Sequence, residues 1–157
     1  MENKQELSKF NVRVYALFVN EKEEVLVSDE IIRTKQYSKF PGGGLELGES
    51  PLECLRRESR EEMNQQIEIV RHFYTTDQFV RSYFRPWEQV ICIYYFAKIL
   101  GPPQFRISSK KFDFDPNLEG DQESFRWQPI AYLQPNDFQF LIDAHVVGLL
   151  RKEYGYF

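Results

Sequence analysis

The pattern of apolar and polar positions predicts a series of β-strands. Five runs are rich in β-branched and aromatic residues and are bounded by polar or turn-forming residues, as strands are. They lie at residues 10–19, 24–28, 67–76, 89–99 and 124–130. The polar turn 20–22 predicts that the first two strands form a hairpin. The run at 89–99 is nearly continuous in apolar residues, which predicts a central place in the sheet.

A helix is predicted from Pro51 to Met63 by its capping residues. Ser50 is a favourable N-cap, proline suits the first helical position, and Glu53 completes a capping box. Asn64 can adopt the left-handed conformation that ends a helix. At about 100° per residue, one face of the helix carries a stripe of buried positions. The stripe consists of Leu52, Leu55, Ser59 and Met63.

A second helix is predicted to begin at residues 135–137 and to pack one apolar face on the sheet. This face carries Phe138, Leu141, Ile142, His145 and Leu149. His145, and His72 in a strand, have no second ligand at metal-binding spacing, so we expect structural roles for both. This order of strands and helices is typical of an α/β fold.

Three further segments are predicted as connections. Residues 31–40 deliver three basic side chains to the glycines that follow. Residues 79–87 alternate aromatic rings with arginines, which indicates either core packing or a surface that stacks on a nucleobase. Residues 101–122 form a connection of roughly 20 residues where about 4 to 6 is typical, so this segment is either a loop that covers a substrate or a mobile excursion.

The composition is that of one globular domain over residues 1–157. With 42% hydrophobic and 16% aromatic residues, 157 residues can close a core without disulfides. A net charge of -4 argues against duplex nucleic acid as a partner. No apolar run approaches the about 20 residues that span a bilayer, so we expect no membrane partner. Cys54 and Cys92 are typical of buried thiols in a reducing compartment, which predicts a cytoplasmic location. A homodimer is left open.

The first predicted helix carries a cluster of carboxylates. Glu58, Glu61 and Glu62 share an arc of about 100° beside the buried stripe. Glu58 and Glu62 form a like-charge pair at i,i+4, which is unfavourable on a helix. Arg57 can pair with Glu61, and a hard divalent cation would compensate the cluster more fully. A solvated acidic face is the alternative interpretation.

Three glycines precede this helix and favour the cation site over the solvated face. Gly42, Gly43 and Gly44 allow positive φ and a close approach of the main chain to a ligand, and a free carbonyl there can join the oxygen ligands of a metal. A solvated acidic face requires no such turn.

This stretch resembles the Nudix box, G-x5-E-x7-R-E-U-x-E-E-x-G-U, where U is a bulky apolar residue. The matching positions are Gly43, Glu49, Arg57, Glu58, Glu61 and Glu62. The chain departs from the box at Ser59, Asn64 and Gln65, which affects its packing rather than its carboxylates; Ile67 is expected to supply the missing apolar contact. The resemblance implies a Nudix α/β/α sandwich, a mixed β-sheet flanked by the Nudix-box helix and a C-terminal helix.

The resemblance also implies an activity, the hydrolysis of a nucleoside diphosphate linked to another moiety, with Mg²⁺ or Mn²⁺ as cofactor. The metal ligands would be Glu58, Glu61 and Glu62, the carbonyl of Gly42, and Glu123 as a further carboxylate. Arg57 would orient these carboxylates together with Glu46 or Glu49. The general base is either Glu58 or a carboxylate outside the box.

The substrate is predicted only as nucleotide-like: a nucleotide, an NDP-sugar or a dinucleoside polyphosphate. Tyr83 resembles a signature of the enzymes that act on diadenosine polyphosphates. The proline expected near Val80 in enzymes that act on ADP-ribose is absent. Arg33 and Lys39 are candidate substrate contacts, as are Lys110 and Lys111, and solvated surface cations are the alternative.

Two other functions within the same resemblance are kept as hypotheses. The first is a nucleotide sensor with little catalysis, although such domains often lose carboxylates that this chain retains. The second is an isomerase of isoprenoid diphosphates, for which Cys92 is the one loose candidate for an additional catalytic cysteine.

Overall fold

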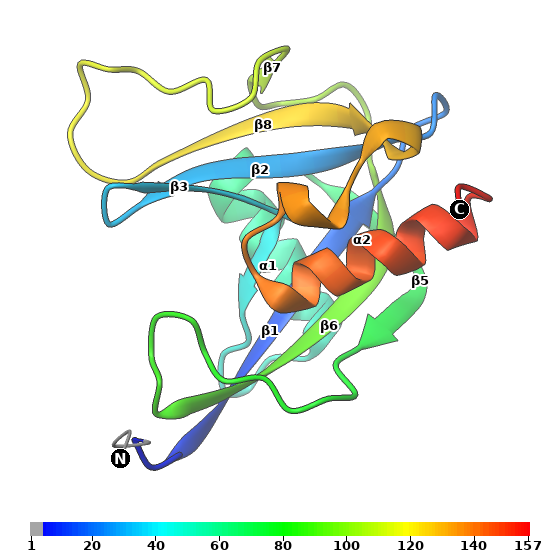
Figure 1. Cartoon of the computed structure of the whole chain (residues 1–157). Coiled ribbons are helices and arrows are strands. Elements are labelled where there is room, and N and C mark those ends of the chain that lie inside the picture. Colours follow the sequence, from blue (N-terminus) through cyan, green and yellow to red (C-terminus); the bar gives the residue numbers. More distant parts are fainter. Residues whose placement is uncertain (1–4) are drawn as a thin grey trace.

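Two four-stranded sheets and two α-helices make up residues 5–157, the part of the chain that the computed structural model describes (Figure 1). The predicted domain over 1–157 includes four residues outside this range. The elements in chain order are β1 (Lys9–Phe18), β2 (Glu24–Ile32), β3 (Lys35–Lys39), β4 (Gly42–Gly44), α1 (Pro51–Met63), β5 (Ile67–Thr75), β6 (Glu88–Ile99), β7 (Ile107–Ser108), β8 (Gln122–Pro129), two 3₁₀ turns, η1 (Ile130–Tyr132) and η2 (Pro135–Asp137), and α2 (Leu141–Glu153).

The first sheet has the strand order β4-β1-β6-β5. β1 runs parallel to β6, with Val14 opposite Ile93, and antiparallel to β4, where Val14 is opposite Gly43. β5 pairs antiparallel with the other side of β6 and contains two register shifts. Since β6 has a strand on each side, the prediction of a central strand at 89–99 is confirmed.

The second sheet has the order β3-β2-β8-β7 and corrects the predicted hairpin of the first two strands. After β1 the chain passes into this second sheet, and only Val19 and Val25 form a bridge across the turn. β2 continues to Ile32 instead of ending at Ser28, because β8 pairs with it over most of its length. A turn motif in the sequence therefore does not decide which sheet each strand joins.

β3 lies in the segment that the sequence predicted as a connector. Arg33 and Thr34 form the tight turn between β2 and β3, with φ angles of 50° and 71°. Such turns favour glycine and asparagine, so an Arg-Thr pair gives no hairpin signal. The segment 101–122, also predicted as irregular, contains the short strand β7, which pairs parallel with β8.

α1 has the predicted bounds and caps. The hydroxyl of Ser50 accepts a hydrogen bond from the Glu53 amide at 3.2 Å, and the Glu53 carboxylate accepts one from the Ser50 amide at 2.7 Å. Asn64 closes the helix with a φ of 50°. The reciprocal bonds satisfy amide groups that would otherwise be unpaired at the start of the helix.

The buried face of α1 is rotated slightly from the predicted stripe. Leu52 is only half-buried, whereas Cys54 is fully buried and its thiol lies 3.5 Å from the carbonyl oxygen of Gly44. The glycines of β4 lack side chains, so α1 comes close to this strand and turns Cys54 toward it. Ser59 is buried as predicted.

Gln65 replaces the apolar residue expected at the end of the box by making hydrogen bonds. It is 2% exposed. Its side-chain amide donates to the carbonyl of Leu100 at 2.9 Å, and its oxygen accepts from the amide of Gln104 at 2.8 Å. Ile67 lies in the neighbouring apolar cluster with Met63. A buried polar side chain with satisfied partners can substitute for an apolar contact.

α2 begins later than the sequence predicted and buries a different face. Residues 135–137 form the separate turn η2, because Phe138 adopts an extended backbone and stacks on Phe40 in the core, with ring centroids 4.9 Å apart. Leu141 and His145 are exposed. The buried face consists of Ile142, Asp143, Val146, Val147 and Leu150. No helix within residues 5–157 is long and apolar enough to cross a membrane.

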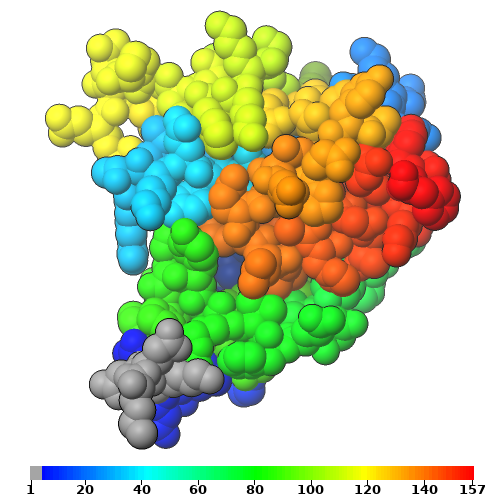
Figure 2. Space-filling model, in the orientation of Figure 1, coloured from blue at the N-terminus to red at the C-terminus, as the bar shows by residue number. Residues whose placement is uncertain are grey.

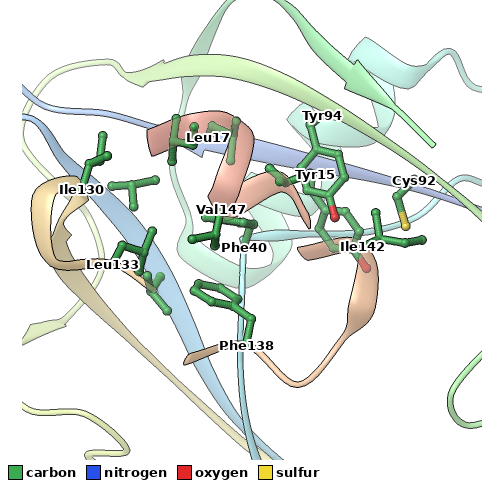
Figure 3. Packing of buried hydrophobic residues seen from close by; sticks show 14 of the residues in the cluster. Tyr15, Leu17, Phe40, Cys92, Tyr94, Ile130, Leu133, Phe138, Ile142 and Val147 are labelled. Carbon is green, nitrogen blue, oxygen red and sulfur yellow. The ribbon is translucent and has the colours of Figure 1, made fainter. Parts of the chain in front are cut away.

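Two apolar clusters hold the layers together. α1 packs on one side through a cluster that includes Leu55, Met63 and Phe125. The other cluster lies under α2, where Phe40, Phe138 and Val147 come together with rings and aliphatic side chains of both sheets (Figure 3). With α1 behind the strands and α2 in front of them (Figure 1), the α/β/α arrangement predicted from the sequence is confirmed.

A buried ion pair connects the strands of the second sheet. Asp29 is 0% exposed, and its carboxylate accepts hydrogen bonds from Arg126 Nε at 2.7 Å and from the Ser38 hydroxyl at 2.7 Å. The amide of Phe112 also donates to it, at 3.1 Å. This one side chain therefore joins β2, β3, β8 and the long segment 101–122.

The variant Asp29→Asn is expected to lower the free energy of unfolding by about 3 to 5 kcal/mol, because it leaves the guanidinium of Arg126 buried without a counter-charge. Urea unfolding followed by circular dichroism measures the change. The control is Glu119→Gln, an exposed carboxylate with no hydrogen bond among residues 5–157, for which we expect a change within about 0.5 kcal/mol. Equal effects of the two variants would contradict the role given to Asp29.

Candidate active site

Arg57 on α1 is bonded to three carboxylates and one carbonyl. Its Nε and Nη2 atoms donate to the two oxygens of Glu49 at 3.0 and 2.7 Å. Nη1 donates to Glu58 at 2.9 Å and to Glu61 at 3.1 Å, and Nη2 also reaches the Gly44 carbonyl at 2.9 Å. The planar guanidinium thus fixes the loop before α1, the helix itself and β4 in one arrangement.

Of the two carboxylates predicted to support Arg57, Glu49 makes the bidentate contact. Glu46 lies farther away, with an oxygen 3.7 Å from Nη1, and is largely exposed. The hydrogen bonds from Arg57 lower the pKa of Glu49 to about 2. Glu49 is therefore ionised at neutral pH.

The glycines of β4 make room for the carboxylate of Glu58. A Cβ atom added to Gly43 would lie 2.4 Å from the Glu58 carboxyl carbon. One added to Gly42, whose φ is 151°, would lie 2.1 Å from the Val14 carbonyl oxygen. Glycine at these two positions lets the acidic helix approach the strand and brings Glu58 against its main chain.

A second group of carboxylates lies on the other sheet. Glu30 on β2 and Glu123 on β8 are directly opposite each other across the ladder, a pairing that is destabilising for like charges. The ammonium of Lys39 lies 3.0 Å from Glu30. The hydroxyl of Ser28 donates to Glu123 at 2.8 Å. Glu30 has no motif around it and was not among the residues selected from the sequence.

The pKa values show that these carboxylates repel one another. Burial and the charge of Glu30 raise the pKa of Glu123 to about 7. Glu62 is exposed at the rim of the cavity described below, yet partial desolvation together with Glu123 and Glu58 raises its pKa to about 9. Carboxylates held in this way gain most from a nearby positive charge.

The carboxylates do not form a ready chelate by themselves. Within the described residues, no three His, Cys, Asp or Glu side chains come together as a metal site. Mg²⁺ usually retains waters and takes only one or two carboxylates, with phosphate oxygens of the substrate as further ligands. The two groups of carboxylates on facing elements fit this mode of binding, in which the substrate completes the site.

A cavity of about 730 Å³ adjoins these groups. Its size suits a nucleotide. Figure 2 shows its mouth as a hollow between the β2–β3 hairpin, the segment 79–87 and the start of α2, with β1 at the floor. Glu58 and Glu62 line the cavity together with Gly42, whereas Glu61 and Glu123 do not.

Lys39 and Arg13 are two of the cationic side chains that line this cavity. Lys39 is 7% exposed, and although burial opposes its charge, Tyr15 and Glu30 raise its pKa above the usual value. Arg13 on β1 donates from Nε to the Tyr15 hydroxyl at 2.6 Å. Arg13 was missed in the sequence, where its one signal is a charged residue in the middle of an apolar strand.

The predicted substrate contacts Arg33, Lys39 and Tyr83 all line the cavity, but Lys110 and Lys111 do not. Of the segment 101–122, only Asp121 borders it. Tyr83 is 58% exposed. Its ring packs against the rings of Tyr37, Phe84 and Phe140. The guanidinium of Arg33 lies 5.3 Å from the Phe84 ring centroid.

Neither the histidines nor the cysteines add reactive groups. His72 and His145 are exposed. Cys92 lines the cavity, but burial raises the pKa of its thiol to about 12. A thiol in this environment remains protonated, so no feature of the site favours the isomerase hypothesis.

The fold and the Arg57 cluster define a Nudix-type α/β/α protein. The model of the NUDIX domain matches residues 9–146, and the chain belongs to this family. No curated protein sequence matches the chain.

Solved structures show the same fold at low sequence identity. A NUDIX hydrolase from Nitrosomonas europaea is 17% identical, with a TM-score of 0.66 over 94% of this chain and 92% of that one. The MutT protein from Methanosarcina mazei Go1 is 16% identical, with a TM-score of 0.66 over 96% and 98%. A UDP-X diphosphatase is 18% identical, with a TM-score of 0.61 over 98% of this chain and 68% of that chain.

The variant Gly43→Ala is expected to lower the free energy of unfolding by about 1 to 3 kcal/mol, because the added methyl group displaces the Glu58 carboxylate from Arg57. The matched control is Gly44→Ala, whose Cβ would meet no atom closer than Arg13 Nη1 at 3.7 Å. Guanidinium unfolding of both variants measures the difference. Equal stability of the two variants would contradict the close packing of Glu58 on Gly43.

Proposed function

We propose that this protein hydrolyses a diphosphate linkage in a nucleoside diphosphate linked to another moiety, with Mg²⁺ or Mn²⁺ as cofactor. One observation carries the proposal: Glu58 and Glu62 of the Arg57 cluster face the same cavity as the buried cation Lys39. Carboxylates that hold a divalent cation and basic groups that hold phosphate are the two requirements of this chemistry.

Arg57 is a positioning residue in this proposal. It fixes Glu58 and Glu61 on α1, while Glu62, which has no hydrogen bond from Arg57, is left to face the cavity. Glu58, Glu61 and Glu62 would hold the cation with the carbonyl of Gly42 and with Glu123. A bound cation neutralises the diphosphate and lowers the pKa of the attacking water.

The basic and aromatic residues would bind the rest of the substrate. Lys39 and Arg13 are placed to contact phosphate oxygens from the cavity floor, and Arg33 to do so from its rim. The ring of Tyr83, which is more than half exposed, suits a planar substrate group. These groups support the nucleotide-like substrate class.

Two carboxylates fit the role of general base. Glu58 is itself one of the proposed cation ligands and is held by Arg57. Glu123 lies outside the box, and its pKa of about 7 suits a group that exchanges protons near neutral pH. Measurement of kcat for Glu58→Gln and Glu123→Gln at saturating metal and substrate distinguishes them. Replacement of the general base is expected to lower kcat more.

The sensor hypothesis and the cellular setting remain separate proposals. The chain keeps each carboxylate of the box, and no feature of the cavity favours binding without catalysis. A cytoplasmic location, predicted from the two cysteines, stays a prediction, and a homodimer stays open.

The test is phosphate release from a panel of nucleoside di- and triphosphates, NDP-sugars and dinucleoside polyphosphates, coupled to a phosphatase. We expect activity that needs Mg²⁺ or Mn²⁺ and is lost on chelation. Glu62→Gln should lower kcat/KM by at least about 100-fold, because even outer partners of metal ligands are worth about 10 to 100-fold. Glu68→Gln, an exposed carboxylate outside α1, is the control and should retain full activity.

If Glu62→Gln keeps full activity, the cation assignment is wrong. If the wild type hydrolyses no member of the panel but binds one of them, the sensor hypothesis replaces the hydrolase.

Arg57→Lys keeps the positive charge but cannot bridge Glu49, Glu58 and Gly44 at once. We expect kcat to fall about 10 to 100-fold with a smaller change in KM, because the carboxylates lose their orientation rather than the substrate its contacts. Arg60→Lys on the same helix is the matched control, since Arg60 is exposed and its side chain makes no hydrogen bond among residues 5–157. Steady-state kinetics at saturating Mg²⁺ measures both, and a change in KM alone would contradict the positioning role.

A further inference from the structure

The cavity contains a buried carboxylate that the proposed reaction does not use. Asp143, in the first turn of α2, is 3% exposed, and Tyr94 on β6 is fully buried. Both residues line the cavity. The hydroxyl of Tyr94 donates a hydrogen bond to Oδ1 of Asp143. In Figure 3 the rings of Tyr94 and Tyr15 lie side by side next to Ile142, the residue that precedes this aspartate.

The second oxygen of Asp143 has no partner in the protein. Among residues 5–157 no side chain or amide donates to Oδ2. The buried side-chain oxygens without a hydrogen bond in this part of the chain are those of Glu30 and Glu88. Oδ2 of Asp143 is not one of them, so it is in contact with the open space of the cavity. Oδ2 is therefore an unpaired acceptor that a molecule in the cavity can reach.

A purely structural role does not account for this oxygen. The neighbours of Asp143 on the buried face, Ile142, Val146 and Val147, are apolar, and burial raises the pKa of Asp143 to about 6. A hydrogen bond that anchors α2 on β6 needs one acceptor, and a neutral side chain supplies it at a lower desolvation cost. The carboxylate is favoured only if its free oxygen also binds something.

The nearby cations do not occupy this oxygen. Lys39 lies against Glu30, and Nε of Arg13 is bonded to Tyr15. Both cations act on Asp143 at longer range, where they offset part of the cost of its burial. What Oδ2 lacks is a hydrogen-bond donor, and an N–H group of a bound molecule can supply one.

The walls beside Asp143 suit a flat ring. Phe140, Ile142, Val80 and Val90 line the same cavity. Apolar walls with one fixed acceptor describe a pocket that orients a planar heterocycle by an edge contact. Glu58 and Glu62 of α1 line the same cavity, so one bound molecule can reach both them and Asp143.

We propose that Asp143, held by Tyr94, is a specificity-determining residue that accepts a hydrogen bond from the exocyclic amino group of a nucleobase. Amino-bearing bases are then favoured over bases that present a carbonyl at the same position. The proposal rests on the proposed function, since it names the base recognised in the cavity where the diphosphate would be cleaved. A carbonyl facing Oδ2 would place two acceptors together and leave both unsatisfied.

The experiment measures binding of nucleoside 5′-diphosphates by calorimetry in the presence of a chelator, so that no hydrolysis is required. Three pairs differ by an amino group replaced with a carbonyl: cytosine and uracil, adenine and hypoxanthine, guanine and xanthine. We expect the wild type to bind the amino-bearing member of at least one pair about 10-fold or more tightly, the ratio expected for a hydrogen bond to a charged acceptor.

Asp143→Asn is nearly isosteric and should cancel or reverse that ratio. Tyr94 must donate to the amide oxygen, so the amide NH₂ group then faces the ligand and favours a carbonyl. Tyr94→Phe keeps the carboxylate and should keep the direction of the preference. Glu153→Gln, at the far end of α2 and paired with Arg71 at the surface, is the control and should leave the ratio unchanged.

A wild type without preference in any pair overturns the proposal, and so does a ratio that survives Asp143→Asn. The wild-type ratios decide the matter even where the variant does not fold. If the ratios behave as expected but the wild type hydrolyses nothing with Mg²⁺ or Mn²⁺, the proposed function fails and base recognition by Asp143 stands.

Discussion

The contact of Arg57 with Glu49, Glu58 and the Gly44 carbonyl is the constraint on which the site depends. A planar guanidinium can satisfy this set in only one arrangement, so the loop before α1, the helix and β4 are fixed relative to one another. Glycine in β4 is the other half of the constraint, because any side chain at Gly43 would occupy the space of the Glu58 carboxylate. The position of Glu58 on α1 therefore depends on glycine at Gly43 in β4.

The electrostatics of the site arise from bringing two sheets together. α1 contributes Glu58 and Glu62 beside the first sheet, and the second sheet contributes Glu30 and Glu123 from paired strands. Each group alone is tolerable in water, but their approach raises the pKa of Glu62 and Glu123. Such repulsion is unfavourable for folding. A divalent cation bound between the groups would relieve it.

The cavity combines two kinds of lining. Charged side chains that suit phosphate line it, and so do apolar and aromatic side chains. Asp143 is also part of the lining, and one of its oxygens accepts a hydrogen bond from Tyr94. Local backbone strain belongs to the rim, where Arg33 and Thr34 hold positive φ in the turn beside the cavity. Strained turns of this kind persist only where the surrounding structure fixes them, here through the hydrogen bond from the Arg33 amide to Asp121.

The sequence by itself determined the elements whose signals are local. The capping box at Ser50, the left-handed Asn64 and the apolar run of β6 each depend on neighbouring residues. The α/β/α class followed from the resemblance of the box residues to the Nudix family. The spacing of the box selected Glu58, Glu61 and Glu62 for the same reason, because one helix turn brings them together. Tertiary structure decided the rest. Contacts between residues far apart in the chain decide which sheet β2 joins and where α2 begins. They also bring Glu30, Arg13 and Asp143 to the cavity. No local pattern in the sequence records such contacts.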